Sequence, residues 1–344
     1  MNTCFVLRSN KGDTRICMAK GGLKELHHHL KEKYPDFKVA LLTDKNLFNL
    51  VEEKLKKDLP EAHVMVVEAS EKSKSMQTAE IICKELLEEG FGKKTILIGL
   101  GGGMITDLAG FISAIFRHGI PYIAMPTSLL AMIDASVGGK TNVNLGDKNV
   151  IGVFYPAEMI MIDLDFLETL PERQLKTGVA EVIKYTAVLE PKLESMLMDK
   201  ETDFVTILEQ GLRTKATVCN EDLDGTGGRR AFFFGHEFGH ALEGISNYQL
   251  THGEGISIGM MLSNQLAQAL KIQQKETSNH IESMLTHYDL PTVLPESITI
   301  KNLLDVVFKD EGKPVNFVLC STLGSYEIRP FLKNEVAEIL EKLN

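Results

Sequence analysis

The sequence predicts an α/β fold in which an N-terminal parallel-sheet domain is followed by a mainly α-helical domain. In the first half of the chain, short apolar runs alternate with amphipathic stretches, which is the pattern of βαβ units on a parallel sheet. From about Pro171 the pattern becomes helical, so we expect domains at residues 1–170 and 171–344. A length of 344 residues with 44% hydrophobic content also suits two domains of roughly 150 residues each.

The individual elements follow from the same patterns in chain order. Strand-like apolar runs in the first half occupy residues 37–44, 64–70 and 93–103. Helical patterns follow the first two runs, from Lys45 onward and over 75–89. In the second half, amphipathic stretches predict helices at 174–198 and 203–219, and a late apolar run predicts a strand at 316–321.

Composition and charge exclude several classes of protein. A formal net charge of -10 opposes binding to polyphosphate backbones, so no nucleic-acid partner is expected. The five cysteines are odd in number and lack CxxC or zinc-ribbon spacing, so we expect no disulfide bonds and a reducing compartment. The first residues resemble no signal peptide, and no stretch approaches the ~18 apolar residues of a membrane span. The expected location is the cytoplasm, without a membrane partner.

Three consecutive glycines mark the first candidate binding site. Residues 95–110, TILIGLGGGMITDLAG, predict a buried strand that ends in Gly101 to Gly103 and continues into a helix. Backbone amides at such a helix N-terminus can approach a diphosphate, so this segment indicates a Rossmann-like dinucleotide site. Because Met104 stands where GxGxxG requires its third glycine, a simple tight connection is the alternative.

A second polar segment, residues 126–156, follows it. Asp134, Lys140, Lys148 and Asn149 surround a turn at residues 138–139 in a stretch that is too rich in Gly and Asn for plain core. Charged residues beside such a turn indicate a lined pocket, and a solvent loop with ordinary ion pairs is the alternative.

Three histidines within seventeen residues predict a metal site. His236 and His240 lie one helical turn apart, His252 follows, and Glu181 and Lys184 occur in the helical segment GVAEVIKY. Two imidazoles and one carboxylate, with a coordination position left open, form a catalytic zinc-type site.

The same segment contains a literal HExxH at residues 236–240, which is the signature of zinc metalloproteases. The metzincin extension requires Gly at position 243 and His at 246, but the chain has Glu243 and Ser246. A protease with a later glutamate ligand such as Glu254 would also leave the dinucleotide half without a purpose. We therefore do not favour a protease.

Taken together, these strings resemble the 3-dehydroquinate synthase family of sugar-phosphate cyclases. The resemblance runs from about Thr43 to Pro330. It depends on GGGMITDLAGF, PTSLLAMIDASVGGKT, KNVIGVFYP, LPERQLKTGVAEVIK and GHEFGHALE followed by HGEG, all in the family's order.

The resemblance implies a role for each matched residue. The metal, Zn²⁺ or Co²⁺, would be held by Glu181, His236 and His252, and His240 would be a nearby acid/base or hydrogen-bonding group. NAD would be contacted by Asp44, Asn46, Glu71, Lys74, Gly102, Gly103, Asp107, Thr127, Ser128, Thr169 and Leu170. The nicotinamide and substrate pocket would be lined by Asp134, Lys140, Lys148, Asn149, Lys184, Lys215 and Arg229.

The implied activity is that of a carbon–oxygen lyase of the shikimate pathway of aromatic amino acid biosynthesis. It would convert 3-deoxy-D-arabino-heptulosonate 7-phosphate into 3-dehydroquinate with release of phosphate. Transient oxidation of a ring alcohol would acidify a neighbouring C–H and permit phosphate loss, and aldol closure would follow re-reduction. NAD would therefore be recycled. The family also commonly forms homodimers.

The sequence departs from the family pattern at four places. Phe233 stands where the family has Asn, and His118 occupies the column of a phosphate-binding Arg, with Arg117 one residue earlier. The loop between Lys140 and Lys148 is one residue shorter than usual. The C-terminal DKK motif reads Asp310-Glu311-Gly312-Lys313, in which Lys313 can replace the second lysine.

These departures keep other functions open. Cyclases that make 2-deoxy-scyllo-inosose or valiolone-type rings use the same scaffold and differ around the Phe233 position. Polyol dehydrogenases share the fold and a His-rich metal site, but they do not explain VGGKT or AEVIKY. A catalytically silent, ligand-binding paralogue is disfavoured because buried ligands without metal are costly.

Overall fold

A seven-stranded sheet organises the first half of the chain, and its neighbouring strands run β1-β2-β9-β6-β5-β3-β4. Only the edge pair β1 and β2 is antiparallel, and every other described pair in this sheet is parallel. The strands are β1 (Thr3–Leu7), β2 (Thr14–Ala19), β3 (Lys38–Asp44), β4 (His63–Val67), β5 (Thr95–Gly101), β6 (Tyr122–Pro126) and β9 (Met159–Asp163).

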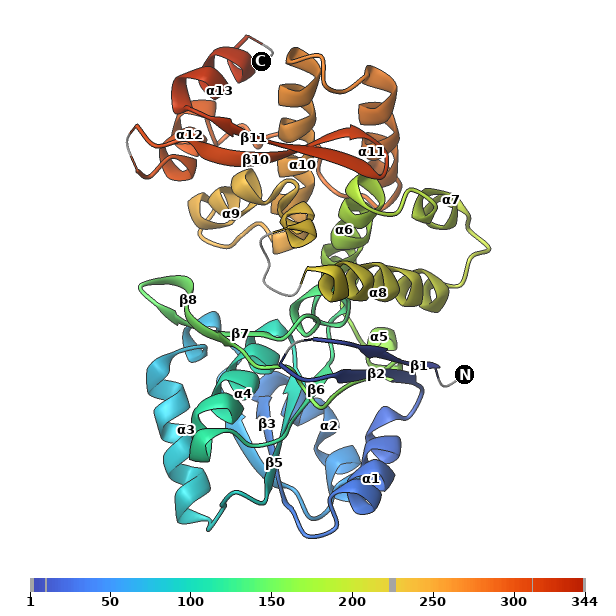
Figure 1. Cartoon of the computed structure of the whole chain (residues 1–344), viewed down its shortest axis with the longest axis vertical. Helices are drawn as coiled ribbons and strands as arrows, with labels where there is room; N and C mark the ends of the chain where they lie inside the picture. Colours follow the sequence, from blue (N-terminus) through green and yellow to red (C-terminus); the bar gives the residue numbers. More distant parts are fainter. Residues whose placement is uncertain (1–2, 10, 223–226, 311, 343–344) are drawn as a thin grey trace. The chain divides into compact units, whose positions relative to one another are not determined.

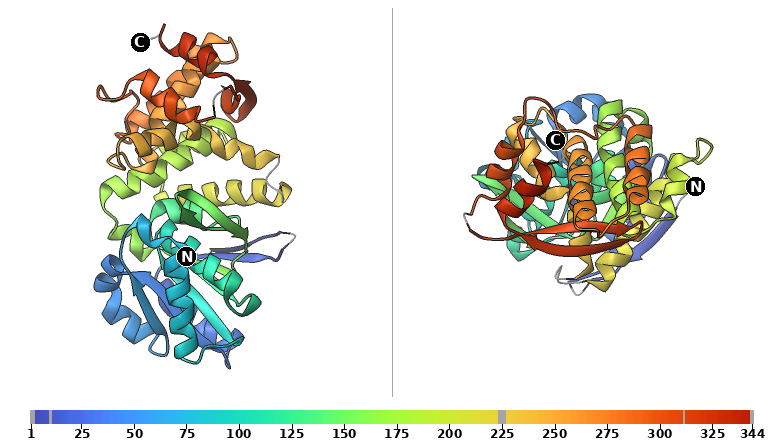
Figure 2. Two further views of the ribbon diagram at one scale, coloured as in Figure 1. Left: turned by 90° about the vertical axis from the view of Figure 1, so that its left-hand side faces the viewer. Right: turned by 90° about the horizontal axis from the view of Figure 1, so that it is seen from above.

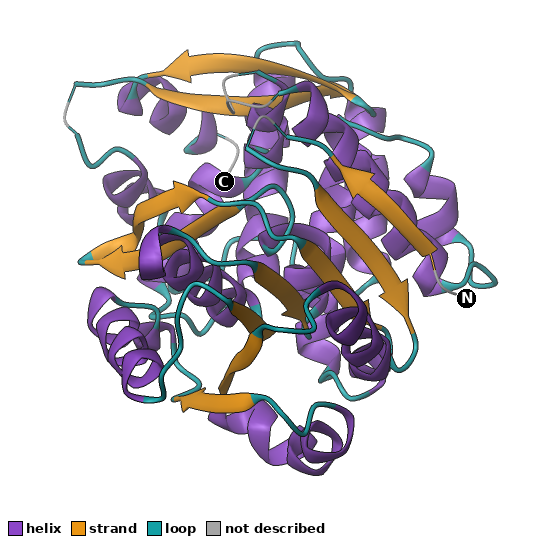
Figure 3. Cartoon of the chain, turned by 60° about the horizontal axis from the view of Figure 1, so that its bottom comes forward, coloured by secondary structure: helices purple, strands orange, loops and turns teal. Residues whose placement is uncertain are grey.

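This computed structural model describes residues 3–9, 11–222, 227–310 and 312–342. The chain separates into two compact units, Met1–Pro171 and Glu172–Asn344, here called unit 1 and unit 2. Figure 3 shows strands and helices mixed in unit 1, whereas helices dominate unit 2. The predicted fold class is confirmed. None of the described helices is long and apolar enough to cross a membrane.

Helices cover both faces of the unit 1 sheet. In Figure 1, α1 and α2 lie on one side of the strands, and α3 and α4 lie on the other. The helical segments are α1 (Gly22–Lys33), α2 (Lys45–Asp58), α3 (Met76–Glu88), α4 (Gly103–Ile115) and α5 (Asp165–Glu168), with the short turns η1 (Glu71–Ser73), η2 (Phe116–His118) and η3 (Ala131–Ala135).

The strand order creates a switch point between β3 and β5. From β3 the chain passes to β4 on one side, and it then crosses back to β5 on the other side of β3. In parallel sheets of this kind, ligands bind outside the carboxyl ends of the strands at the switch point. Asp44 ends β3 and Gly101 ends β5, so the glycine-rich segment starts where the topology predicts a ligand.

Strand β5 is buried along its whole length, and α4 packs directly on it. A Cβ on Gly99 would lie 2.7 Å from Ala109 Cβ, and one on Gly101 would lie 2.8 Å from Ile105 Cβ. These two glycines therefore let the helix approach the strand. By contrast, a Cβ on Gly102 would meet nothing closer than Ser128 Oγ at 3.6 Å, so packing alone does not require that glycine.

A hairpin formed by β7 (Lys140–Leu145) and β8 (Asp147–Phe154) extends unit 1. The hairpin lies within the polar segment 126–156, for which a pocket-lining segment was expected. Its β7 strand packs on α4, where Gly110 allows close contact with Thr141. Asn144 N–H donates to the Lys74 carbonyl at 2.8 Å, so the hairpin is joined to the connection that follows β4.

Unit 2 consists mainly of helices, with one two-stranded hairpin that lies along one side of them (Figure 2). The helical segments are α6 (Glu172–Val188), α7 (Leu193–Met198), α8 (Phe204–Glu221), η4 (Gly228–Phe233), α9 (His236–Ile245), α10 (His252–Ala269), α11 (Lys275–His287), α12 (Ile300–Val307) and α13 (Lys333–Leu340). The hairpin strands are β10 (Val315–Thr322) and β11 (Ser325–Phe331).

The structure alters two of the expected elements. The helix expected over 174–198 is divided into α6 and α7, because Pro191 cannot continue a helix and α6 ends at Val188. The strand expected over 64–70 ends at Val67 and gives way to η1, where the Ser70 side chain accepts from the N–H of Lys72. The other expected elements form within a few residues of their predicted bounds.

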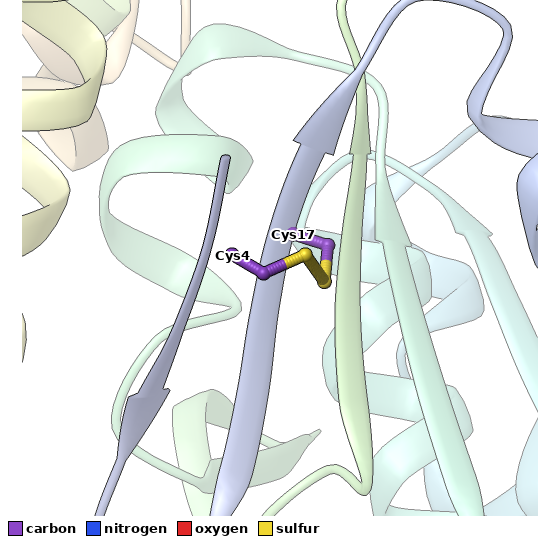
Figure 4. Close-up of a disulfide and its surroundings, with 2 residues drawn as sticks. All are labelled: Cys4 and Cys17. Atoms are coloured by element: carbon purple, nitrogen blue, oxygen red, sulfur yellow. A yellow bond between two sulfur atoms is a disulfide. The ribbon is translucent and has the colours of Figure 1, made fainter. Parts of the chain in front are cut away.

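The prediction that no disulfide forms was wrong. Cys4 on β1 and Cys17 on β2 are bonded, as Figure 4 shows. They are direct partners in the antiparallel register, and their Cα atoms are 4.2 Å apart. Motif spacing could not reveal this pair, because strand pairing rather than sequence distance brings the two residues together. Cys83, Cys219 and Cys320 lie outside this bond and remain thiols.

This bond leads to a stability prediction. In the absence of reductant, Cys4→Ser should lower the free energy of unfolding of unit 1 by roughly 3 kcal/mol, because a bridge across a loop of this size restricts the unfolded chain. Urea denaturation with and without dithiothreitol measures the effect. Cys83→Ser is the matched control, because it keeps the bridge and should lose stability in dithiothreitol as the wild type does, whereas Cys4→Ser should not respond to reductant. An equal stability of oxidised and reduced wild type would contradict the prediction.

Candidate functional site

Three residues from different helices of unit 2 form a candidate metal centre. Glu181 lies on α6, and His236 and His252 are the first residues of α9 and α10. One potential ligand atom from each lies within 4.8 Å of those of the other two. Both imidazoles face one carboxylate oxygen, since Glu181 Oε1 is 3.6 Å from His236 Nε2 and 3.2 Å from His252 Nε2.

The second ring nitrogen of each histidine is already engaged. His236 Nδ1–H donates to the carbonyl oxygen of Phe234 at 3.2 Å. His252 Nδ1–H donates to Glu243 Oε1 at 2.8 Å, because a carboxylate can only accept. These bonds favour the tautomer in which Nε2 carries the lone pair, and this is the usual arrangement of metal-binding histidines. The donor set therefore fits a divalent metal.

Charged side chains pair with one another within this cluster. Glu181 and Lys184 are fully buried and form an ion pair through Glu181 Oε2. Burial lowers the pKa of His252, but hydrogen bonds to Glu181 and Glu243 outweigh that effect and raise the pKa to about 9.

Glycines bring the three helices close enough for these contacts. A Cβ on Gly259 of α10 would lie 2.0 Å from the carbonyl oxygen of Gly235, just before α9. A Cβ on Gly253 would lie 2.5 Å from Thr177 Cα on α6. No side chain fits at either place, so His252 is placed by backbone contact on two sides.

His240 takes a different position from the three clustered ligands. It is exposed and groups with Glu243 and His252, whereas neither potential metal group of the described residues contains both His236 and His240. A zincin site requires both histidines of HExxH on one ion. The arrangement therefore supports the rejection of a protease. The centroid of the His240 ring lies 5.1 Å from that of the His236 ring, so His240 stands beside the cluster.

The predicted basic residues of unit 2 are buried, and Lys184 pairs with Glu181 of the cluster. Lys184 Nζ and Lys215 Nζ lie 5.7 Å and 5.4 Å from the centre of the Phe232 ring, so both cations lie close to one aromatic side chain. Arg229 is also buried, and its Nη2 donates to the Cys219 carbonyl at 3.3 Å. Buried cations in such number suit an anionic ligand.

The departures from the family pattern take distinct positions. Phe233 is 44% exposed, and its ring lies 6.0 Å from that of His236, so an apolar face borders the metal cluster. Arg117 and His118 are exposed in unit 1 and adopt positive φ values of 52° and 66°. Lys313 pairs with Asp310 at 3.0 Å on the surface of unit 2. Glu311 lies outside the described residues.

In unit 1, many of the predicted NAD residues follow the carboxyl ends of parallel strands. Asp44 is the last residue of β3, Gly102 and Gly103 follow β5, and Thr127 and Ser128 follow β6. Gly102 caps α4 without a side-chain hydrogen bond, and no acidic residue occupies the first turn. The first amides of that helix are therefore suited to a diphosphate.

Two of the predicted NAD positions have structural roles as well. The Asp44 carboxylate accepts from the N–H groups of Asn46 and Leu47 at 3.0 and 3.1 Å, so it caps α2. Thr169 follows α5 rather than a strand and donates to the Phe166 carbonyl. Asn46 and Thr169 are exposed, and Leu170 is partly exposed.

Lys74 joins several of the remaining residues. Its Nζ lies 2.5 Å from both Asp107 Oδ2 and Asn149 Oδ1, which links α4 to the β7–β8 hairpin. Glu71 accepts from Asn144 Nδ2 at 2.8 Å on the same hairpin. Burial raises the pKa of Asp107 to about 6, although Lys74 counteracts the shift.

The other predicted residues of this segment lie nearby or on the surface. Lys140 and Asp107 line one small pocket of unit 1 with Tyr122 and Tyr155. Asp134 is partly buried in η3, and Lys148 is exposed on β8.

Motif comparison alone missed Glu243 and Asn144. Glu243 lies two turns after His236 on one helix face, so helical periodicity could have revealed it. No local pattern marks Asn144, because its role depends on the pairing of the hairpin with η1.

Comparison with known families agrees with this geometry. Residues 64–177 match the family described as 3-dehydroquinate synthase N-terminal, and residues 178–313 match 3-dehydroquinate synthase C-terminal. The 3-dehydroquinate synthase of Thermococcus kodakarensis is 38% identical over 266 residues, covering 77% of each chain. That of Desulforamulus reducens is 35% identical over 347 residues, covering 96% of each chain.

Solved structures with a similar fold include two cyclases. A 2-deoxy-scyllo-inosose synthase, complexed with carbaglucose-6-phosphate, NAD⁺ and Co²⁺, has a TM-score of 0.90 at 20% identity and covers 99% of this chain and 100% of its own. The 2-epi-5-epi-valiolone synthase ValA from Streptomyces hygroscopicus, with NAD⁺ and Zn²⁺ bound, has a TM-score of 0.84 at 23% identity, covering 98% of each. A glycerol dehydrogenase from Schizosaccharomyces pombe reaches 0.64 at 18%, covering 95% of this chain and 88% of its own.

The Asp107 carboxyl supports a pH prediction. Because its folded pKa of about 6 exceeds the ordinary 3.8, the folded protein binds a proton that the unfolded chain has lost between these pH values. Its contribution to stability should fall by on the order of 3 kcal/mol as the pH rises from about 4 to about 6.

The measurement is urea denaturation of wild type and Asp107→Asn across this pH range. The difference between the two proteins should carry the dependence, since Asn cannot titrate. Asp13→Asn removes an exposed carboxyl and is the control. A difference that stays constant with pH would contradict the assignment.

Proposed function

The chain belongs to the 3-dehydroquinate synthase family, and we propose that it converts 3-deoxy-D-arabino-heptulosonate 7-phosphate into 3-dehydroquinate and phosphate. The observation that carries this proposal is the convergence of Glu181, His236 and His252 in a chain that is 34–38% identical to 3-dehydroquinate synthases. The reaction class is a carbon–oxygen lyase, because the carbon–oxygen bond to phosphate is broken by elimination.

NAD and a divalent metal, Zn²⁺ or Co²⁺, are the proposed cofactors. When bound, the metal would polarise a substrate oxygen and NAD would accept and later return a hydride. Glu181, His236 and His252 would hold the metal. Asp44, Asn46, Glu71, Lys74, Gly102, Gly103, Asp107, Thr127, Ser128, Thr169 and Leu170 would bind NAD, together with Asp134, Lys140, Lys148 and Asn149.

The buried cations of unit 2 are suited to hold the anionic groups of the substrate. Lys184, Lys215 and Arg229 are all at least 90% buried, where a charge interacts more strongly than in water. Holding the substrate's carboxylate and phosphate in fixed positions lowers the barrier by reducing the entropy that must be lost. His240 is exposed beside the metal cluster and could exchange protons with the substrate.

A second candidate function rests on Phe233. An exposed aromatic ring beside His236 offers no hydrogen bond, so a substrate that lacks the corresponding polar group would be accepted as well. That feature favours a cyclase for another sugar phosphate, of the 2-deoxy-scyllo-inosose or valiolone type. Identity to the reported cyclases of those types is lower, at 20–23%, than identity to 3-dehydroquinate synthases.

A metal-dependent polyol dehydrogenase is a weaker candidate. The glycerol dehydrogenase fold agrees less closely, with a TM-score of 0.64. Net reduction of NAD by a simple polyol would favour this function, since a cyclase recycles its NAD.

The primary test is turnover of 3-deoxy-D-arabino-heptulosonate 7-phosphate with catalytic NAD and Zn²⁺ or Co²⁺. Phosphate release and the cyclic product are followed by mass spectrometry. Turnover should fall roughly a hundredfold or more in each of the variants Glu181→Ala, His236→Ala and His252→Ala, because each loses a metal ligand. Glu282→Gln, on the surface of α11, should retain full activity.

Sedoheptulose 7-phosphate and glucose 6-phosphate are run in parallel. Turnover of either one in place of the heptulosonate would replace the proposed substrate with that of another cyclase. Absence of turnover on all three would refute the enzymatic proposal.

We also propose that the enzyme is a cytoplasmic homodimer, as is common in the family. Light scattering should give twice the mass of one chain at micromolar concentration, and a monomer mass would rule the dimer out.

A further inference from the structure

Glu243 is a buried carboxylate that contacts a proposed metal ligand without belonging to the proposed ligand set. It lies two turns after His236 on α9, and only 5% of its surface is exposed. Its Oε1 accepts a hydrogen bond of 2.8 Å from His252 Nδ1. The opposite edge of the same imidazole faces Glu181, with 3.2 Å between Nε2 and Oε1.

The two histidines differ in what holds their outer nitrogen. His236 donates to a neutral backbone carbonyl, whereas His252 donates to a charged carboxylate. A hydrogen bond to an ionised acceptor is roughly twice as strong as one to a neutral acceptor. It also increases the electron density on the imidazole and hence its basicity toward a metal.

His252 has a particular need for such a partner. It is the first residue of α10, where the positive end of the helix dipole disfavours a cationic ring and a developing positive charge. Its side chain is 20% exposed, compared with 10% for His236. Glu243 supplies the negative charge that both orients the ring and offsets the helix terminus.

We propose that Glu243 is a positioning residue for the metal centre, which fixes His252 with Nε2 directed at the metal and strengthens that ligand. This inference rests on the proposed metal site. Glu243 touches the metal only through His252, so its loss should weaken metal binding without abolishing it.

Cobalt binding to the metal-free full-length protein tests this role. Co²⁺ affinity is measured by competition with a chelator, and the visible absorption bands report the ligand geometry. Glu243→Gln, which keeps an acceptor oxygen but loses the charge, should weaken Co²⁺ binding about tenfold, and Glu243→Ala up to about a hundredfold, with altered bands. Glu282→Gln should bind Co²⁺ as wild type does.

Further variants separate this inference from the metal site itself. Glu181→Ala should abolish the cobalt bands. If it does while Glu243→Ala binds as wild type does, the positioning role is wrong and the metal site stands. If Glu181→Ala also binds normally, the proposed metal site fails and the inference fails with it.

The second potential group, His240 with Glu243 and His252, provides another decisive outcome. Two Co²⁺ ions bound by wild type and one by Glu243→Gln would make Glu243 a direct ligand and overturn the positioning role. Should Glu243→Ala fail to fold, Glu243→Gln alone carries the test, because it conserves shape. Unfolding midpoints in the presence of chelator identify any such loss of folding.

Discussion

Backbone contact between α9, α10 and α6 is the constraint on which the proposed metal centre depends. The axes of two packed helices normally lie about 8–10 Å apart, because side chains separate the helices. Glycines at Gly235, Gly239, Gly255 and Gly259 remove that separation between α9 and α10, and Gly253 removes it against α6. Each helical glycine costs roughly 1 kcal/mol in helix propensity relative to alanine, so the close packing must offset several such penalties. The resulting short distance between His236 and His252 is what a single metal ion requires.

The charges around this contact form a matched set. Glu181 is fully buried, and each of its carboxylate oxygens has its own partners. One oxygen pairs with Lys184, and the other faces both histidines. His252 in turn lies between Glu181 and Glu243, and these carboxylates raise its pKa even though burial opposes a charged ring. A buried carboxylate without such partners would be expensive. The side chains that pair with one another here are therefore the same ones whose donor atoms lie close enough together to hold a divalent ion.

Unit 1 uses glycine for two different purposes. Gly99 and Gly101 allow α4 to lie against β5, and the contacts that a Cβ would meet explain them fully. Gly102 faces no such restriction, so its value lies in the open N-terminus of α4 and the suitability of that end for a diphosphate. Lys74 then joins the helix to the β7–β8 hairpin through Asp107 and Asn149. The sequence marked Gly101 and Gly102 alike, as members of one glycine run, and could not separate packing from binding.

The alternation of apolar runs and helical patterns was sufficient to predict β3, α2, α3, β5 and α8, because local periodicity reports which face of an element is buried. The histidine spacing and the motifs that resemble the family could also be recognised in the sequence, because each lies within a short segment. Other features depend on residues far apart in the chain. The Cys4–Cys17 bond, the placement of Asn144 against η1 and the bond from Glu243 to His252 all require strands or helices to pair first. Periodicity determines which residues face inward, but only tertiary packing determines which inward residues meet.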